Sequence, residues 1–385
     1  MSDLLSFGPG QPAHQILDPG VRAHGPRGGG AAAVVFLLRD DFTSDEAAPL
    51  ASPRTCEPGP GTLTVVQASA GATFSILDSK LEARGVEVYN NCRIRSDAFT
   101  RTAGLGVVFD LQRLIPTSPR HFTGWHSSIN PTTGTLITGL INNNVVIMSG
   151  GSIVTNASIN TADHLVFLIL RSVGDFFIHK SGSNWLLLWV SNVSSVSPLY
   201  WGHVQYDFDV CKMDYVRATQ LPAPWDDDDG IATQILSGAR SPGDTWTHEA
   251  DHLTYATITT LPSSGQIEFR FRIQDASNYW QVTVDSTGSL DLDEVVAGTP
   301  TQRGTAAGVV SAGGRIGWAA DGSTIAVYDS TARRINYTSA TNFQTETDGE
   351  LETEGTGGSV TGIEVWPRTL SGAALAALEA VVNAP

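Results

Sequence analysis

The feature that most constrains this chain is a strict alternation over residues 266–273, which read Gln-Ile-Glu-Phe-Arg-Phe-Arg-Ile. Apolar residues take every second place, and Glu268, Arg270 and Arg272 stand between them. Because successive side chains of a strand point to opposite faces, the pattern predicts a strand with one buried and one solvent-facing side. Such a strand needs a second layer over its apolar side, so we expect packed β-structure.

Other strand signals recur at short intervals, and most are bounded by Gly, Asn, Ser or Pro. Many short strands separated by turns are typical of a sandwich. Uninterrupted apolar runs in the first half predict central strands that are covered on both faces. Residues 371–382, rich in Ala and Leu, predict a single C-terminal helix. The clearest further strand signals lie at 61–66, 73–77, 104–109, 134–139, 144–148, 165–170, 176–179, 185–190, 279–284, 288–292, 314–318, 324–328 and 361–366.

Composition and charge narrow the classes of function. The chain has 385 residues, of which 41% are hydrophobic, so two domains can each bury a core. Its net charge of −16 repels phosphate backbones, so we expect no nucleic-acid partner. The sequence shows no apolar stretch near the roughly 20 residues that span a bilayer, so we expect no membrane insertion. The N-terminus lacks a basic segment followed by an apolar one, so we expect no Sec signal peptide.

Composition shifts along the chain predict four segments. Residues 1–33 form a Gly/Pro-rich arm, which is either a disordered tail or an anchor that becomes ordered against a neighbouring subunit. Residues 34–222 form a first domain, and 223–230 form a linker that contains four successive aspartates at 226–229. Residues 231–385 form a second domain. The acidic run is either a solvated turn or a calcium ligand set.

The three cysteines all fall in the first domain, at Cys56, Cys92 and Cys211. One disulfide among them is one alternative, and reduced buried thiols are the other. The sequence contains no CxxC pair, so a zinc site has no support.

The order of motifs in the second domain resembles the laminin-G/concanavalin A-like family. The matching residues are Asp275, Asn278, Tyr279, Trp280 and Val282, then Asp321-Gly322, then 366–371 (Trp-Pro-Arg-Thr-Leu-Ser). The first domain carries a looser version at 176–190 and 214–217. The resemblance implies an all-β fold of two concanavalin-like β-sandwich (jelly-roll) domains, with an extended N-terminal arm and a short C-terminal helix. It identifies no single activity, since folds of this kind host many functions.

Candidate ligand-binding residues are aromatic, because aromatic faces stack on sugar rings. Among the nine tryptophans, Trp125, Trp246 and Trp280, together with Tyr279, are the candidates for a sugar platform. A role in the core or at a hinge is the alternative for each of these tryptophans and for Trp201 and Trp225, whereas those inside strand patterns are expected in the core: Trp185, Trp189, Trp318 and Trp366. In related lectins, loop Asp and Asn side chains hold calcium. The resemblance therefore implies Asn278, Asp285 and Asp321 as metal ligands, although no motif fixes them, and we expect no cofactor other than calcium.

Catalysis has little support in the sequence. Glucanases of this fold carry paired carboxylates spaced Glu-x-Asp-x-Glu, and residues 346–350 match that spacing. The intervening residues are Thr347 and Gly349, within an acidic, Gly-rich tract that offers no burial for a carboxyl. We expect a solvated loop there, leading to an edge strand. No nucleophile elbow, P-loop or metal-binding His motif is present, so we expect no enzyme activity.

The combination of a lectin-like fold, a Gly/Pro arm and no catalytic set is typical of bacteriophage virion proteins. We therefore expect a structural or appendage protein of a virion, associated with its capsid or tail and assembled in the host cytoplasm. Its domains would present a surface for glycan or host-surface adhesion. The arm would contact other virion subunits, and the chain would form a homo-oligomer. The alternatives are a bacterial surface or secreted glycan-binding protein, and a glycoside hydrolase of the same fold.

Overall fold

The computed structural model divides into residues 1–33 and a compact unit, Val34–Pro385. The N-terminal arm and the acidic run at 226–229 lie outside the described residues. Described are residues 34–384 except 48–49, 51, 69–72, 85–91, 114–119, 127–133, 142–143, 150–151, 158–162, 173, 192–197, 207–209, 226–229 and 331.

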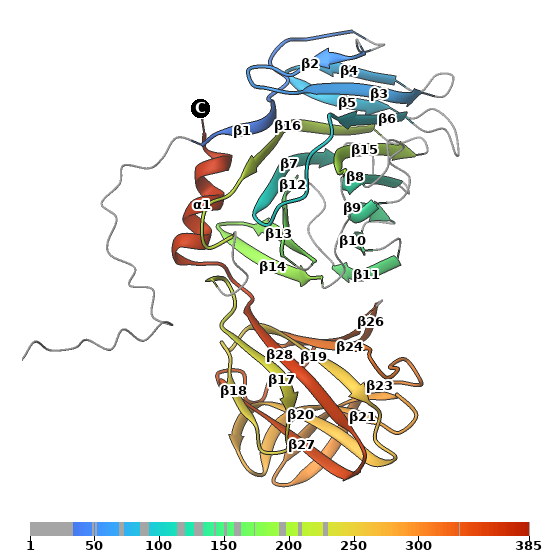
Figure 1. Cartoon of the computed structure of the whole chain (residues 1–385), viewed down its shortest axis with the longest axis vertical. Coiled ribbons are helices and arrows are strands. Elements are labelled where there is room, and N and C mark those ends of the chain that lie inside the picture. The colour runs from blue at the N-terminus through green and yellow to red at the C-terminus, as the bar shows by residue number, and fades with distance from the viewer. Residues whose placement is uncertain are drawn as a thin grey trace, which may run out of the picture. The chain divides into compact units, whose positions relative to one another are not determined.

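Two antiparallel sheets form the first sandwich (Figure 1). Sheet 1 contains, in spatial order, β14 (Asn184–Val190), β13 (Asp175–Ser181), β12 (Asp163–Leu170), β7 (Leu105–Arg113), β16 (Val210–Gln220), β5 (Lys80–Arg84) and β4 (Thr73–Leu77), with β1 (Phe36–Asp40) also paired to β16. Sheet 2 contains β11 (Ser152–Ala157), β10 (Asn144–Ser149), β9 (Gly134–Ile141), β8 (Arg120–His126), β15 (Tyr200–Tyr206), β6 (Cys92–Ser96), β3 (Thr62–Ala68) and β2 (Arg54–Thr55).

Two further antiparallel sheets form the second sandwich. Sheet 3 contains, in spatial order, β17 (Gln234–Arg240), β28 (Ser359–Pro367), β19 (His252–Thr260), β24 (Arg315–Asp321), β25 (Thr324–Asp329) and β26 (Arg333–Tyr337). Sheet 4 contains β18 (Thr245–Thr247), β27 (Asp348–Thr356), β20 (Ser264–Asp275), β21 (Asn278–Asp285), β22 (Leu290–Val296) and β23 (Thr299–Ala306). The all-β class with a short C-terminal helix is therefore as predicted.

The C-terminal helix α1 (Gly372–Val382) packs on the first sandwich, although the sequence placed it in the second domain. Leu378 and Val381 are buried in the same core as sheet 1. The Trp185 indole N–H donates to Glu379 Oε1 at 2.6 Å, and the Arg217 guanidinium donates to the carbonyl oxygen of Val382 at 2.9 Å. The helix thus covers the side of sheet 1 that faces away from sheet 2, which explains why β12, β13 and β14 read as uninterrupted apolar runs. No helix among the described residues has the length and apolar character needed to cross a membrane.

In the second sandwich, the alternation over 266–273 sets the core as expected for most of its length. Ile267, Phe269 and Phe271 on β20 are fully buried, and the Phe269 ring lies 5.2 Å from that of Trp318 on the facing sheet. The pattern breaks at Arg272, which the sequence places on the polar face. Its φ of +48° is in the left-handed region, and its side chain is 0% exposed. The backbone kink therefore redirects this side chain into the protein.

The two sandwiches share one hydrophobic core through the outer face of sheet 3. Tyr255 and Tyr328 on that face pack edge-on against Trp189 of β14, at 5.7 and 5.4 Å between ring centroids. The Arg315 guanidinium lies 3.8 Å from the Tyr255 ring centroid and donates to the Val190 carbonyl oxygen at 2.7 Å. This contact continues the apolar core of sheet 1 into the second sandwich.

A buried histidine pair lies beside the kinked Arg272. The rings of His248 and His252 stack at 3.8 Å between centroids. Both Nδ1 atoms lie within hydrogen-bond distance of the Glu249 carbonyl oxygen, at 2.8 and 2.9 Å, and His248 Nε2 lies 3.1 Å from the Asp348 carbonyl oxygen. A protonated imidazole would lie next to the positive charge of the buried Arg272 guanidinium. Burial and the Arg272 charge therefore both favour the neutral form of each histidine.

We predict that the free energy of unfolding falls as the pH drops from 6.5 towards 4. Burial lowers the pKa of His248 from 6.5 to about 4, so within this window the unfolded chain binds a proton that the folded chain does not. The shift corresponds to on the order of 3 kcal/mol. Denaturant unfolding of wild type and His248→Gln at pH 7, 6 and 5 checks this: the variant should start less stable and lose less on acidification.

Asp175 contributes in the opposite direction, because burial raises its pKa to about 7 and the folded state then binds the extra proton. Since Asp175 is present in both proteins, its effect cancels in the comparison. Equal losses of stability in wild type and His248→Gln would contradict the assignment.

Candidate functional site

The polar outer face of sheet 4 is the candidate site. It carries the outward residues that alternate with the core positions of β20, β21 and β22. Glu268 pairs across the strands with Thr283, and Thr283 in turn with Asp291. These three residues form the first row of the face. Two residues further along β20, Arg270 pairs with Gln281, and Gln281 pairs with Asp293, so these three form the second row.

These outward side chains are more enclosed than residues of a plain solvent-facing sheet. Gln281 is 5% exposed, Thr283 2% and Glu268 8%. The Gln281 amide Nε2 donates to Asp293 Oδ2 at 3.1 Å, but its Oε1 is buried and receives no hydrogen bond from the described residues. Asp291 Oδ1 is likewise buried and receives no hydrogen bond from the described residues. A buried acceptor without a donor is costly, so both oxygens are positioned for donors that the described residues do not supply.

The electrostatics of this face are dominated by carboxylates. Burial raises the pKa of Asp293, and the neighbouring carboxylates of Asp291 and Glu268 raise it further, against the lowering effect of the hydrogen bond from Gln281. Arg270 is the one basic side chain in the two rows, and its Nη2 pairs with Glu268 at 2.8 Å. The face therefore presents many acceptors and few free donors.

Tyr279 is the predicted ligand-binding residue that the structure places on this face. Its ring is stacked under the Arg270 guanidinium, at 4.9 Å from the centroid, and it is 9% exposed. The edge of the ring and its hydroxyl border the two rows. Sequence reasoning had marked Glu268 and Arg270 as outward-facing, but it did not single out Gln281, Asp291 and Asp293. The same alternation in β21 and β22 is the signal that could have found them.

The three predicted sugar platforms are core residues, so the structure corrects that expectation. Trp125, Trp246 and Trp280 are 0%, 2% and 0% exposed. The Trp280 indole N–H donates to the Asn342 carbonyl oxygen at 3.0 Å, and Trp246 packs against Trp318 at 6.2 Å between centroids. A ring in such a place offers no free face to a sugar. All nine tryptophans of the chain are at most 4% exposed, which favours the core alternative for every one.

The predicted metal ligands Asn278, Asp285 and Asp321 are not brought together. Asn278 and Asp285 begin and end β21, and Asp321 lies on sheet 3. Asp285 Oδ1 accepts the Thr287 and Ser289 backbone N–H groups and so forms the turn between β21 and β22. Among the described residues, no group of three or more His, Cys, Asp or Glu side chains is arranged to hold a metal ion. Calcium binding therefore stays a prediction without a site.

Of the sequence match at 346–350, Glu346 and Thr347 lie in the loop before β27, as expected. Residues 348–350 begin β27, which lies between β18 and β20 and is therefore not the edge strand that was expected. Glu350 faces outward and lies 3.7 Å from the Arg270 guanidinium. Gly349, between the two carboxyls, packs against Trp246 and faces the core. Cys56 is a free buried thiol, and the side chains of Cys92 and Cys211 lie outside the described residues.

Comparisons with known proteins give no family. No family model matches the chain, and no curated protein matches its sequence. Solved structures with a similar arrangement include a galectin of Caenorhabditis elegans (9% identity, 34% of this chain and 94% of that chain, TM-score 0.29). Another is a glycosyl hydrolase family protein from Mycobacterium fortuitum (13% identity, 48% of this chain and 100% of that chain, TM-score 0.32). A third is the exoplasmic/lumenal domain of VIP36 in a Ca²⁺-bound form (8% identity, 40% of this chain and 85% of that chain, TM-score 0.32). Likeness of this size identifies neither a family nor an activity.

We predict that Trp280→Ala lowers the free energy of unfolding by about 3–5 kcal/mol, because it opens a cavity in the core and leaves the Asn342 carbonyl oxygen without its donor. Denaturant unfolding monitored by fluorescence measures the change. A change below about 1 kcal/mol, of the size seen at exposed sites, would show that the indole is not a core residue.

Proposed function

We propose that the outer face of sheet 4 binds glycan, without catalysis. The observation that carries the proposal is the pair of buried acceptors, Gln281 Oε1 and Asp291 Oδ1, which lack donors among the described residues. Sugar hydroxyls are compact donors that also accept hydrogen bonds, so a saccharide laid across the two rows would satisfy both oxygens once a rotation of these two side chains turns them towards the surface. Such a ligand needs no aromatic platform, in agreement with the burial of every tryptophan.

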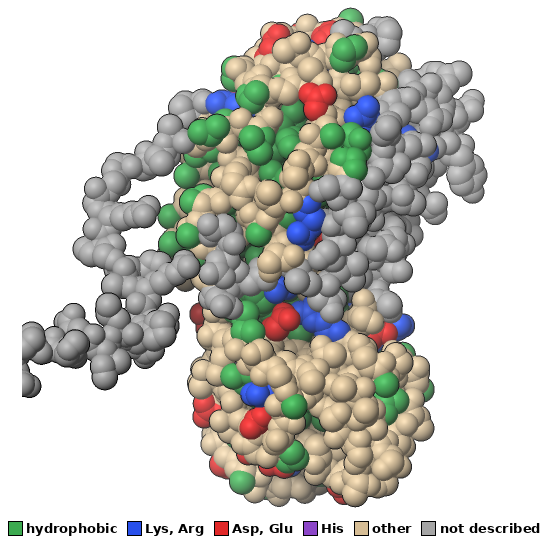
Figure 2. Space-filling view, in the orientation of Figure 1, with side chains coloured by type: hydrophobic (Ala, Val, Ile, Leu, Met, Phe, Trp, Pro, Cys, Tyr) green, Lys and Arg blue, Asp and Glu red, His purple; other side chains and the backbone are tan. Residues whose placement is uncertain are grey.

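The charge of the face selects the class of sugar. Burial raises the pKa of Asp293, and the carboxylates of Asp291 and Glu268 lie close enough to raise it further. The one arginine in the rows is already paired with Glu268. Carboxylates repel anionic ligands and accept hydrogen bonds from neutral ones. The face therefore favours neutral saccharides. Figure 2 shows hydrophobic side chains on the visible side of the second sandwich only as small separate spots.

We expect Gln281→Leu and Asp293→Asn to weaken binding of neutral glycans by tenfold or more, since each removes acceptors from a buried site. A glycan array with the purified protein identifies the ligand, and titration of the best neutral glycan measures the loss. Glu346→Gln is the matched control: it makes the same kind of acid-to-amide change at a half-buried position in the loop before β27 and should bind as wild type does.

Two results would overturn this proposal. One is unchanged glycan binding by Gln281→Leu. The other is release of reducing sugar by wild type that Asp293→Asn abolishes, because the raised pKa of Asp293 would then serve a general acid and the chain would be a hydrolase.

The biological setting that we propose is a virion appendage that uses this face for adhesion to a host surface, with the N-terminal arm contacting other virion subunits in a homo-oligomer. Two sandwiches that share one core form a single compact module suited to projection from a particle. A bacterial surface or secreted glycan-binding protein is the alternative.

Mass spectrometry of density-purified particles tests the setting: we expect peptides of this chain at a fixed ratio to the major coat protein. Absence from every purified particle would reject the virion setting and leave glycan binding by sheet 4 untouched.

A further inference from the structure

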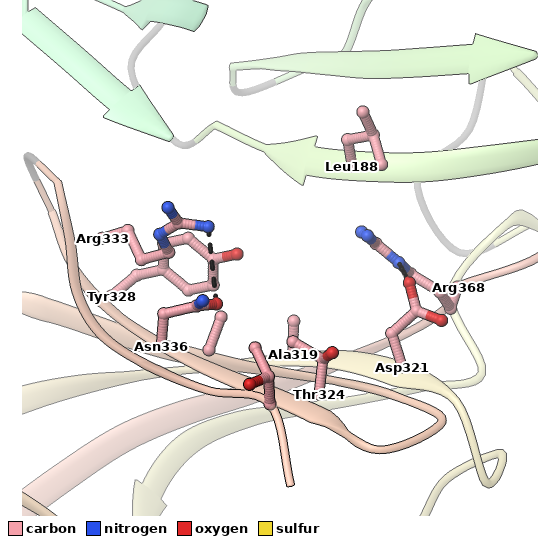
Figure 3. A pocket seen from close by; sticks show the side chains of 10 residues that line it. Leu188, Ala319, Asp321, Thr324, Tyr328, Arg333, Asn336 and Arg368 are labelled. Atoms are coloured by element: carbon pink, nitrogen blue, oxygen red, sulfur yellow. Dashed lines mark hydrogen bonds and ion pairs between the residues drawn. The ribbon is translucent and has the colours of Figure 1, made fainter. Parts of the chain in front are cut away.

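A second candidate site, which carries two arginines where the outer face of sheet 4 carries carboxylates, lies between β14 and the outer face of sheet 3 (Figure 3). It is a cleft of about 300 Å³, within the range of volumes of small-molecule sites. Ala319 and Ala326 supply apolar lining, and Leu188 of β14 lies across from Ala319. Arg333 stands at one end and Arg368 at the other, as Figure 3 shows.

Arg333 at the first end lacks an anionic partner. Its only hydrogen bond among the described residues is a long one, 3.5 Å from Nη1 to Asn336 Oδ1, and no carboxylate lies within ion-pair distance there. Its neighbour Arg334, by contrast, pairs with Asp329 at 2.6 Å. In a chain with 39 acidic and 23 basic residues, an arginine left without a carboxylate keeps the local potential positive.

Arg368 at the second end is fixed in place and keeps spare donors. Its Nε donates to Asp321 Oδ2 at 3.1 Å, and its Nη1 donates to the Leu187 carbonyl oxygen at 2.8 Å. Its Nη2 has no acceptor among the described residues, and the side chain lines the cleft. Because two of its three nitrogens are already held, this guanidinium would lose little conformational entropy on binding a ligand.

We propose that this cleft binds a monosaccharide unit that carries a carboxylate. The carboxylate would pair with Arg333, whose planar fork matches it. The ring hydroxyls would donate to Asp321 and Asn336 and accept from Arg368 and from the hydroxyl of Thr324. Asp321 disfavours a compact dianion such as phosphate, while a singly charged, hydroxyl-rich ring can use it as an acceptor. The cleft is on the other sheet from the glycan-binding face, so this inference does not depend on the proposed function.

Isothermal titration with sodium glucuronate, glucose and inorganic phosphate tests the proposal. We expect wild type to bind glucuronate more tightly than either of the others. Arg333→Gln should weaken glucuronate binding about tenfold or more, the loss typical of a charge-assisted pair. Arg334→Gln is the matched control, since it removes the same charge one residue away, where the guanidinium pairs with Asp329 and does not line the cleft.

A second variant guards against a folding defect. Asn336→Asp places a carboxylate beside Arg333 without removing the arginine, and it should reduce glucuronate binding to a similar extent. The proposal is overturned if wild type shows no glucuronate binding at millimolar concentrations, if phosphate binds as tightly as glucuronate, or if Arg334→Gln loses as much as Arg333→Gln. Neutral glycan binding by sheet 4 should be unchanged in all three variants, so failure here is distinguishable from failure of that site.

Discussion

The outer face of sheet 3 carries Leu253, Tyr255 and Trp366 where a solvent-facing sheet would carry polar residues, and all three are buried in the core that sheet 1 also shares. Exposing such a face would cost about 25 cal/mol for each Å² of apolar surface, so it must be covered. The strand β14 of the first sandwich covers it. The tandem is therefore one body built on a continuous core, and the linker between the sandwiches does not have to hold them together.

This constraint determines where ligands can bind. With one outer face of the second sandwich buried against β14, only the outer face of sheet 4 is left to carry a broad polar surface. At its margin lies the cleft between Arg333 and Arg368, which Leu188 of β14 and residues of sheet 3 line together. The same packing that joins the sandwiches thus creates a recess with walls from both of them.

The sequence predicted the architecture because alternation reports burial directly. The strands β20, β21, β24, β25 and β28 were all recognised from apolar positions that the structure places in the core. The strand β23 (Thr-Pro-Thr-Gln-Arg-Gly-Thr-Ala) was missed, because it is an edge strand with mostly exposed residues and its pairing comes from β22 alone. The sequence also did not predict that α1 packs on sheet 1, because this packing depends on contacts between residues far apart in the chain, such as Trp185 and Glu379.

Site residues were harder to predict than strands, for a physical reason. A tryptophan is a sugar platform or a core residue according to whether its ring is covered, and Trp246 and Trp280 sit at positions whose inward direction is set by pairing with Gly349 and Phe271. Arg272 shows the same limit for polar residues, since a left-handed φ of +48° turns an outward position inward. Composition tells which groups are present, and only register and backbone conformation tell which face they occupy.

The two candidate sites illustrate how one acidic chain can offer different chemistry on two faces of a single sandwich. On sheet 4 the carboxylates of Glu268, Asp291 and Asp293 share a surface with one arginine, which Glu268 already neutralises. In the cleft, Arg368 is neutralised by Asp321 but Arg333 is not. Dissolved salt screens exposed charges that lie farther apart than about 10 Å at an ionic strength of about 0.1 M. Each face can therefore select its ligand by local pairing, even though the net charge of −16 belongs to the whole chain.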